Sequence, residues 1–151
     1  IGEAPGLNED KQGKPFVGKS GKLLRRVLKK YNLLENSYIT NVVKCRPPAN
    51  RKPRSEECDA CKPYLLAEIK EIKPKLIILL GLTAINAFLP NERYVKNKVY
   101  KFNKVGKVFL GYSYHPSYIL KNKSEEVNFI QFFNNVANIY QHVNPYYTKP
   151  I

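Results

Sequence analysis

Apolar residues recur along the chain in two different patterns, one typical of helices and one typical of buried strands. The first pattern is a three- and four-residue spacing, which places these apolar side chains on one helical face: Leu23, Leu24, Val27, Leu28 and Tyr31. Residues 21–33 are therefore predicted to form an amphipathic helix. The second pattern is the continuous apolar run within Lys75–Gly81. Such a run is typical of a strand buried on both faces.

Further elements follow in alternation. They are a strand end at Ile1–Glu3, a strand at Tyr38–Val43, a helix beginning at Ser55, a short helix at Thr83–Leu89, a strand at Val108–Tyr112 and a helix from Ser124 to about His142. Ser20 is predicted to cap the first helix. Residues 90–105 are polar and are predicted to form an exposed loop or ribbon. This order predicts a single α/β domain over residues 1–151, a three-layer α/β/α sandwich around a mostly parallel sheet of about four strands.

Ligands of such sheets bind beyond the carboxyl ends of the strands. Three segments follow predicted strands: Gly2–Gly6, Thr40–Asn41 and His115–Ser117. Asn41 stands out because asparagine is depleted in strands and a buried amide needs partners. Each residue also has a structural interpretation, since Asn41 could brace the backbone and His115 could organise a helical turn. Phe16 could likewise tether its loop to the core.

The net charge of the chain indicates which class of partner it binds. The chain has 26 Lys and Arg against 12 Asp and Glu, a net charge of +14. A domain this basic attracts polyanions, which favours nucleic acid, although a general lysine bias would give the same charge. No apolar run is long enough to cross a bilayer and no secretory signal is visible. We therefore expect an intracellular, cytoplasmic and nucleoid-associated monomer that does not bind membranes.

Three cysteines do not suggest a disulfide framework. Cys58 and Cys61 form a C-x-x-C pair, and Cys45 lies upstream. Reduced thiols that bind a partner are the favoured interpretation. A zinc site made by the three cysteines with a distant histidine is an alternative. A thioredoxin-like redox pair fits less well, because Pro63 and the preceding long basic loop are unlike that motif.

Five ordered motifs together resemble the family 4 uracil-DNA glycosylases. They are Gly2–Gly6 with Glu9 and Asp10, Gly13–Gly18, Tyr38–Pro48, Cys61–Leu65 with Leu79–Ala84, and His115–Leu120. The resemblance extends to about residue 140. The chain begins on Ile1 and contains no methionine, so we expect it to lack an N-terminal segment.

The resemblance implies that the protein excises uracil from DNA to begin base excision repair, after rotating the nucleotide into a pocket. Phe16 would stack on the base. The amide of Asn41 would donate to uracil O4 and accept from N3–H, which cytosine cannot match. His115 would donate to O2 and stabilise the departing uracil anion, a role open to a neutral imidazole.

The motifs identify the residue that would activate the attacking water less directly. In family 1 glycosylases the corresponding turn carries an aspartate, and here that position is Ala4, which would line the substrate pocket. Glu3 is the first candidate for orienting the water or stabilising the sugar cation, and Glu9 is the second. Bracing of the loop through backbone N–H groups is the alternative role of both carboxylates.

The resemblance also implies DNA contacts at Ser117, Tyr118 and Lys121, with residues 118–120 as an apolar wedge. It implies a 4Fe–4S cluster, for which Cys45 and Cys61 match the second pair of thiolates. The first pair would lie upstream of Gly2, so this chain alone would not complete the set. Cys58 has no counterpart in the family pattern.

Two other functions stay open. One is a glycosylase with a broader range of deaminated bases, which the amide of Asn41 disfavours. The other is a non-catalytic DNA-binding relative that serves replication proteins. Downstream repair or replication proteins are possible partners in either case.

Overall fold

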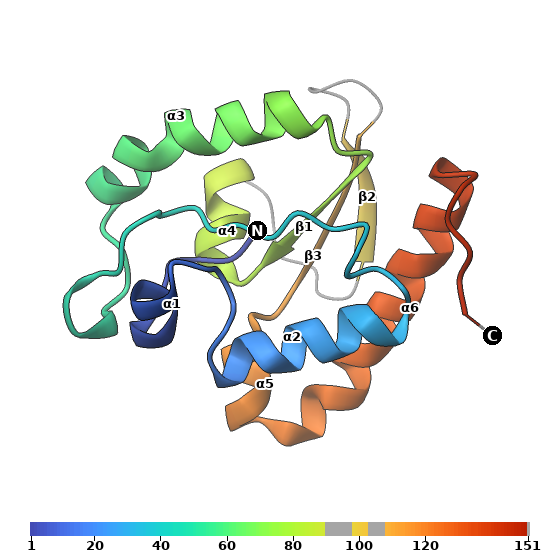
Figure 1. The fold of residues 1–151 in the computed structure, drawn as a ribbon, viewed down its shortest axis with the longest axis horizontal. Helices are drawn as coiled ribbons and strands as arrows, with labels where there is room; N and C mark the ends of the chain where they lie inside the picture. Colours follow the sequence, from blue (N-terminus) through green and yellow to red (C-terminus); the bar gives the residue numbers. More distant parts are fainter. Residues whose placement is uncertain (90–97, 103–107, 151) are drawn as a thin grey trace.

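A computed structural model describes residues 1–89, 98–102 and 108–150 (Figure 1). Its helices and strands are α1 (Leu7–Gln12), α2 (Lys19–Lys30), α3 (Ser55–Ile72), β1 (Leu76–Leu80), α4 (Leu82–Phe88), β2 (Lys98–Phe102), β3 (Val108–Ser113), α5 (Pro116–Lys121) and α6 (Glu126–Val143). Short 3₁₀ turns occupy Pro48–Asn50 and Lys123–Glu125. The strands form a sheet in the order β1-β3-β2, with β1 parallel to β3 and β2 antiparallel to it.

The side chains of β1 alternate between two hydrophobic cores, as expected of a strand buried on both faces. Ile77 and Leu79 pack in one core with Leu65 of α3 and Ile85 of α4. Leu80 packs in the other core, which α2 and α6 supply. Figure 1 shows α3 and α4 on one side of the sheet and α2, α5 and α6 on the other. The predicted three-layer α/β/α arrangement is confirmed.

The predicted sheet of about four mostly parallel strands is wrong in detail. The described residues hold three strands, in one parallel and one antiparallel pair. The predicted strands at Ile1–Glu3 and Tyr38–Val43 are extended segments that share a single parallel bridge, between Gly2 and Asn41. Only Gly2 and Glu3 bond to residues 40–43, so the hydrogen bonds do not build a regular ladder.

Most other predicted elements are confirmed, with ends displaced by a few residues. Helix α1 was not predicted, because it buries no side chain and so has no apolar stripe to reveal it. The assignment of Ser20 as a helix cap is wrong, since Gly18 caps α2. Within the predicted loop or ribbon at 90–105, residues 98–102 form β2, and the rest lies outside the described residues.

None of the helices in the described part of the chain combines the length and apolarity needed to span a membrane.

Helix α2 lies very close to the loop before it. A Cβ atom added at Gly21 would lie 2.1 Å from the carbonyl carbon of Phe16. Alanine normally stabilises a helix interior relative to glycine by up to about 1 kcal/mol. At this position the close approach of the Phe16 backbone leaves no space for a methyl group, so glycine is required.

We therefore expect Gly21→Ala to destabilise the protein by about 1–3 kcal/mol, the usual cost of overpacking. Urea denaturation measures the change. Lys22→Ala, an exposed position in the same helix, is the matched control and should be close to neutral. A stabilised Gly21→Ala variant would contradict the close packing of α2 on residue 16.

Candidate functional site

A small cavity of about 30 Å³ lies beyond the carboxyl ends of β1 and β3. It is lined by Ala4, Glu9, Phe16, Ser20, Asn41 and His115. Five of these residues were predicted from the sequence, and the structure brings them together from segments far apart in the chain. Ser20 was expected only to cap a helix, and no sequence pattern distinguished its side chain as part of a pocket.

Asn41 presents an unused hydrogen-bond acceptor to this cavity. The residue is 5% exposed, and its Oδ1 has no hydrogen-bond partner among the described residues. Buried side-chain oxygens are normally paired, so an orphaned one marks a place for a ligand or water. A Cβ at Gly2 would lie 2.7 Å from Oδ1, which shows how closely the first turn approaches this amide.

The backbone that carries Asn41 is fixed from the side of α3. The ammonium of Lys44 donates to the Asn41 carbonyl at 2.8 Å and to the hydroxyl of Thr40 at 2.5 Å. Lys44 also pairs with Glu68 of α3, whose carboxylate accepts from Thr40 at 2.9 Å. Hydrogen bonds to Lys44, Tyr38 and Thr40 outweigh the effect of burial and hold the pKa of Glu68 below its usual value. This ionic network was not predicted from the sequence.

Phe16 covers one side of the cavity. It is 5% exposed, and its ring stacks on that of His115 with centroids 5.6 Å apart and planes inclined by 26°. Its backbone adopts the left-handed conformation, with φ of 55°, which is costly for a bulky residue. Arg25 of α2 stabilises it, because its guanidinium donates to the carbonyls of Pro15 and Phe16, each at 2.8 Å.

His115 sits where β3 leads into α5 and caps that helix. Its Nδ1 accepts the backbone N–H of Ser117 at 3.1 Å and lies 2.8 Å from the Ser117 hydroxyl. A nitrogen that accepts an N–H carries no proton, so the proton of the neutral ring is on Nε2. Burial lowers the pKa of His115 to about 4. The imidazole is therefore a neutral hydrogen-bond donor at pH 7.

Glu9 is held by the loop around it. Its carboxylate accepts backbone N–H groups of Gly6 at 3.1 Å, Val17 at 2.7 Å and Gly18 at 2.6 Å. Burial raises the pKa of a carboxyl group, but these donors outweigh it and the pKa of Glu9 lies below its usual value. Glu9 thus braces the loop, as one interpretation of the sequence suggested, and it also lines the cavity.

The side chain of Glu3 lies outside the cavity. Its carboxylate accepts the hydroxyl of Thr83, at the start of α4, at 2.5 Å. It is absent from the cavity lining, whereas the next residue, Ala4, belongs to it. Successive residues of extended backbone point in opposite directions, which separates the two side chains. The sequence motif did not reveal on which side each would lie.

The residues expected to contact DNA lie on the short helix α5. Ser117, Tyr118 and Leu120 are exposed, as is Lys121. Tyr118 stacks on Tyr114, with centroids 4.1 Å apart and planes inclined by 21°. These side chains therefore project from the helix that His115 caps, next to the cavity.

Cys61 of α3 lies beside the segment that carries Cys45. The backbone N–H of Lys44, next to Cys45, donates to the sulfur of Cys61 at 3.4 Å. Hydrogen bonds of this type tune the thiolates of iron–sulfur clusters, which normally number four. Burial raises the pKa of the third thiol, Cys58. No cluster of three or more potential metal ligands is formed by the described residues.

Comparisons with known proteins identify the family of the chain. The family model of the uracil DNA glycosylase superfamily matches residues 1–141. A type-4 uracil-DNA glycosylase of Thermotoga maritima is 45% identical over 132 residues, covering 84% of this chain and 68% of the relative. One of Saccharolobus solfataricus is 45% identical over 132 residues, covering 81% of this chain and 61% of the relative. A DNA polymerase of Bacillus phage SP01 is 30% identical over 153 residues, covering 96% of this chain and 16% of the polymerase.

The chain therefore belongs to the uracil-DNA glycosylase superfamily and, within it, to the type-4 uracil-DNA glycosylases, as the motifs indicated. The matches span 61% to 68% of the length of these two type-4 relatives.

The state of His115 can be tested by nitrogen-detected NMR. We expect a neutral ring with its proton on Nε2 at pH 7, and titration well below the ordinary value of 6.5. Because the unfolded chain binds this proton more readily, folding stability should fall as the pH drops from 6.5 towards 4. The urea-unfolded protein, titrating near 6.5, is the control. A folded-state pKa at or above 6.5 would refute the buried neutral ring.

Proposed function

We propose that this chain is the catalytic domain of a uracil-DNA glycosylase, which hydrolyses the bond between uracil and deoxyribose in DNA and so begins base excision repair. The observation that carries the proposal is the buried, unpartnered Oδ1 of Asn41 beside Phe16 and His115. The type-4 relatives support the same activity.

Base recognition follows from the chemistry of these side chains. The Asn41 amide offers an acceptor for N3–H of uracil and a donor for O4. Cytosine presents an acceptor and a donor in the opposite order, so it leaves both ends of a buried amide mismatched. The ring of Phe16 supplies a stacking surface that is indifferent to base identity.

Leaving-group departure would depend on His115. Breaking the glycosidic bond places negative charge on uracil, chiefly on its carbonyl oxygens. The Nε2–H of a neutral His115 would donate to O2 and stabilise that charge, with the ring already oriented by Ser117. Such a donor acts without transferring its proton.

Water must then attack the sugar cation, and Glu9 is the better placed carboxylate. It lines the cavity, whereas Glu3 is bound to Thr83. The low pKa of Glu9 keeps it ionised, which suits a group that orients water and stabilises a positive sugar. Glu3 would instead anchor the first turn on α4 and hold Ala4 in the lining.

The DNA and the cluster would attach around this cavity. Tyr118 and Leu120 would fill the space that the flipped base leaves, with Ser117 and Lys121 near the backbone phosphates. Cys45 and Cys61 would supply two thiolates of a 4Fe–4S cluster, whose bonds would link the loop after Asn41 to α3. The remaining ligands would come from outside this chain. An enzyme with this activity would work inside the cell, where its substrate, uracil-containing DNA, is found.

The proposal can be tested with a uracil-containing oligonucleotide, followed by alkaline cleavage of abasic sites. We expect Asn41→Asp to lower uracil excision by a factor of about 100 or more, since a buried hydrogen-bonding site is disrupted. Leu7→Ala, exposed on α1, is the control and should retain activity. Unchanged excision by Asn41→Asp would make Asn41 structural.

The roles of the two carboxylates can be separated in the same assay. We expect Glu9→Gln to lower kcat by a factor of about 100, within the range of acid–base groups, and Glu3→Gln to lower it by less than about tenfold. Thermal denaturation of both variants checks that each remains folded. A larger loss of kcat in Glu3→Gln would reverse the assignment.

The match to the phage DNA polymerase favours one second candidate, a DNA-binding module that accompanies replication. Retained affinity for uracil-containing DNA with no abasic product, in protein that carries its full cluster, would support that module and refute the glycosylase.

A further inference from the structure

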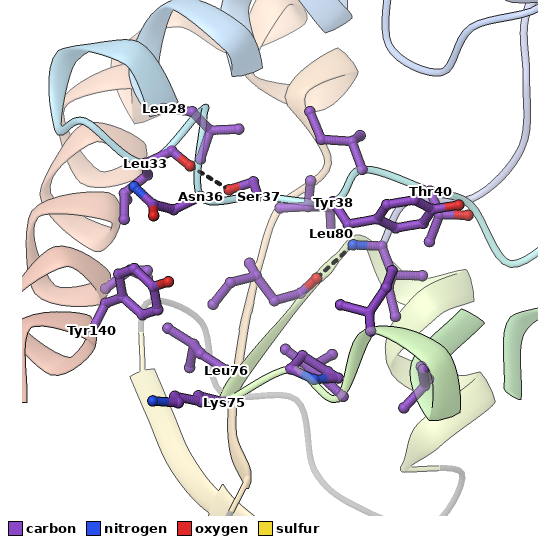
Figure 2. Close-up of a pocket in the computed structure, with 18 of the residues that line it drawn as sticks. Leu28, Leu33, Asn36, Ser37, Tyr38, Thr40, Lys75, Leu76, Leu80 and Tyr140 are labelled. Carbon is purple, nitrogen blue, oxygen red and sulfur yellow. Dashed lines mark hydrogen bonds between the residues drawn. The ribbon is translucent and has the colours of Figure 1, made fainter. Parts of the chain in front are cut away.

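Helix α2 lies between the sheet and the loop that carries Phe16. Leu24 and Leu28 lie on its sheet side, where they line a second cavity of about 340 Å³ together with residues of β1 (Figure 2). Gly21 and Arg25 lie one turn apart on its loop side. Gly21 lets the Phe16 backbone approach, and Arg25 is the next side chain on that side to meet the loop. Arg25 therefore contacts the loop from a helix that the sheet holds in place.

The guanidinium of Arg25 and the carboxylate of Glu9 bind the two ends of one peptide group. Nε of Arg25 donates to the Phe16 carbonyl at 2.8 Å. Glu9 accepts the N–H of Val17 at 2.7 Å, and this N–H belongs to the same peptide unit as that carbonyl. A cation at the oxygen and an anion at the hydrogen both match the peptide dipole, so each hydrogen bond strengthens the other. The plane of this peptide group is thereby fixed from two sides.

The peptide groups on either side are held in the same way. Nη2 of Arg25 donates to the carbonyl of Pro15 at 2.8 Å. The Glu9 carboxylate accepts the N–H of Gly18 at 2.6 Å. The planar fork of Arg25 thus binds two successive carbonyls, a geometry that the compact ammonium of lysine does not reproduce. We call Arg25 and Glu9, which hold residues 15–18 between them, the loop clamp.

The loop clamp holds Phe16 in a backbone conformation that bulky residues rarely adopt. Its φ of 55° lies in the left-handed region, while its buried ring stacks on His115. Strained residues of this kind persist only where the surrounding structure determines their conformation, and they cluster at functional sites. Without Arg25, the loop loses two of the hydrogen bonds that oppose a return to negative φ. Such a return would turn the Phe16 ring away from His115.

The next residue along α2 offers a direct comparison. The side chain of Arg26 is 69% exposed and pairs at 3.0 Å with Glu126, at the start of α6. Arg25 and Arg26 carry the same charge in a chain with a net charge of +14, so the loss of either changes the total charge equally. General attraction to phosphate depends on such charges. Arg25 differs from Arg26 in donating to the loop backbone.

We propose that Arg25 is a positioning residue of the base-excision site, which keeps the Phe16 ring over the small cavity beside His115. Arg25 does not line that cavity, so it acts through Phe16. The inference rests on the proposed function, in which Phe16 stacks on the flipped base. Placement matters there, because a misplacement of about 1 Å can lower a rate by about 100-fold.

Single-turnover excision from a uracil-containing oligonucleotide, with the enzyme at saturating concentration, tests the proposal. We expect Arg25→Gln to lower the excision rate constant by about tenfold to 100-fold, because the ring no longer lies where the base must stack. Arg26→Gln removes the same charge and is the matched control, which should keep the rate constant of the parent protein. Equal rate constants in Arg25→Gln and Arg26→Gln would overturn the proposal.

A third variant separates the charge of Arg25 from its hydrogen bonds. Arg25→Lys keeps the charge but lacks the planar fork. We expect it to bind DNA as tightly as the parent protein and still to excise uracil more slowly. A full excision rate in Arg25→Lys would show that charge alone is needed, which contradicts positioning through the two carbonyls.

Proton NMR of the histidine rings gives a readout that does not depend on activity. The chain has two histidines, and the exposed His142 on α6 is an internal reference. The ring current of Phe16 acts on the ring protons of His115, so their resonances in Phe16→Leu mark the loss of stacking. We expect Arg25→Gln to move them most of the way to those positions and Arg26→Gln to leave them in place. Unmoved His115 resonances in Arg25→Gln would refute the positioning role.

The two readouts also separate this inference from its alternatives. A purely structural role of Arg25 would lower the midpoint of thermal denaturation but change neither the rate constant of the folded protein nor the His115 resonances, and would refute the proposal. If Arg25→Gln does not fold, Arg25→Lys takes its place in the NMR comparison, with the same expected direction. A parent protein that excises no uracil would contradict the proposed function, and the NMR comparison would then decide the placement of Phe16 by itself.

Discussion

The short hydrogen-bonded pairing around Gly2 is the constraint on which the site depends. Gly2 bonds to Thr40 and Val42, and its lack of a side chain lets Phe16 and Asn41 approach. The pairing thereby brings three separate segments to one point beyond the strands: the first turn, the loop before α2 and the backbone of Asn41. His115 reaches the same point from the end of β3. A side chain on Gly2 would separate the stacking ring from the amide.

The periodic elements could be predicted because their pattern is a direct result of burial. Leu23–Leu28 and Lys75–Gly81 were assigned correctly, since each must place apolar side chains against a core. Helix α1 buries nothing, and the segment at Tyr38–Val43 pairs only over one bridge, so neither had a reliable pattern. The motifs identified Asn41, Phe16 and His115 as residues of a pocket, which the structure assembles. They did not reveal that Glu3 turns towards Thr83 or that Ser20 lines the cavity, because both depend on backbone direction.

The electrostatics of the cavity differ from those of the whole chain. The protein carries a net charge of +14, yet the cavity contains a neutral imidazole and a carboxylate surrounded by backbone N–H groups. In the proposed function, general attraction to phosphate and selection of a base would thus fall to different parts of the molecule. Raising the salt concentration should weaken the first far more than the second, because salt screens exposed charges more than it weakens contacts to buried side chains such as Asn41 and Phe16.

The stacking of Phe16 on His115 bears on how quickly a base could enter the cavity. A cavity of about 30 Å³ accommodates one or two waters, and a pyrimidine is several times larger than a water. If this cavity receives the base, as proposed, the two stacked rings would have to separate before the base could enter. A nucleotide that leaves the DNA helix only briefly would return before the two rings separate. A mispaired nucleotide stays outside the helix longer and would more often find the rings apart. Under the proposed function, the resting enzyme would discriminate by the lifetime of the extrahelical base before the proposed hydrogen bond to Asn41 forms.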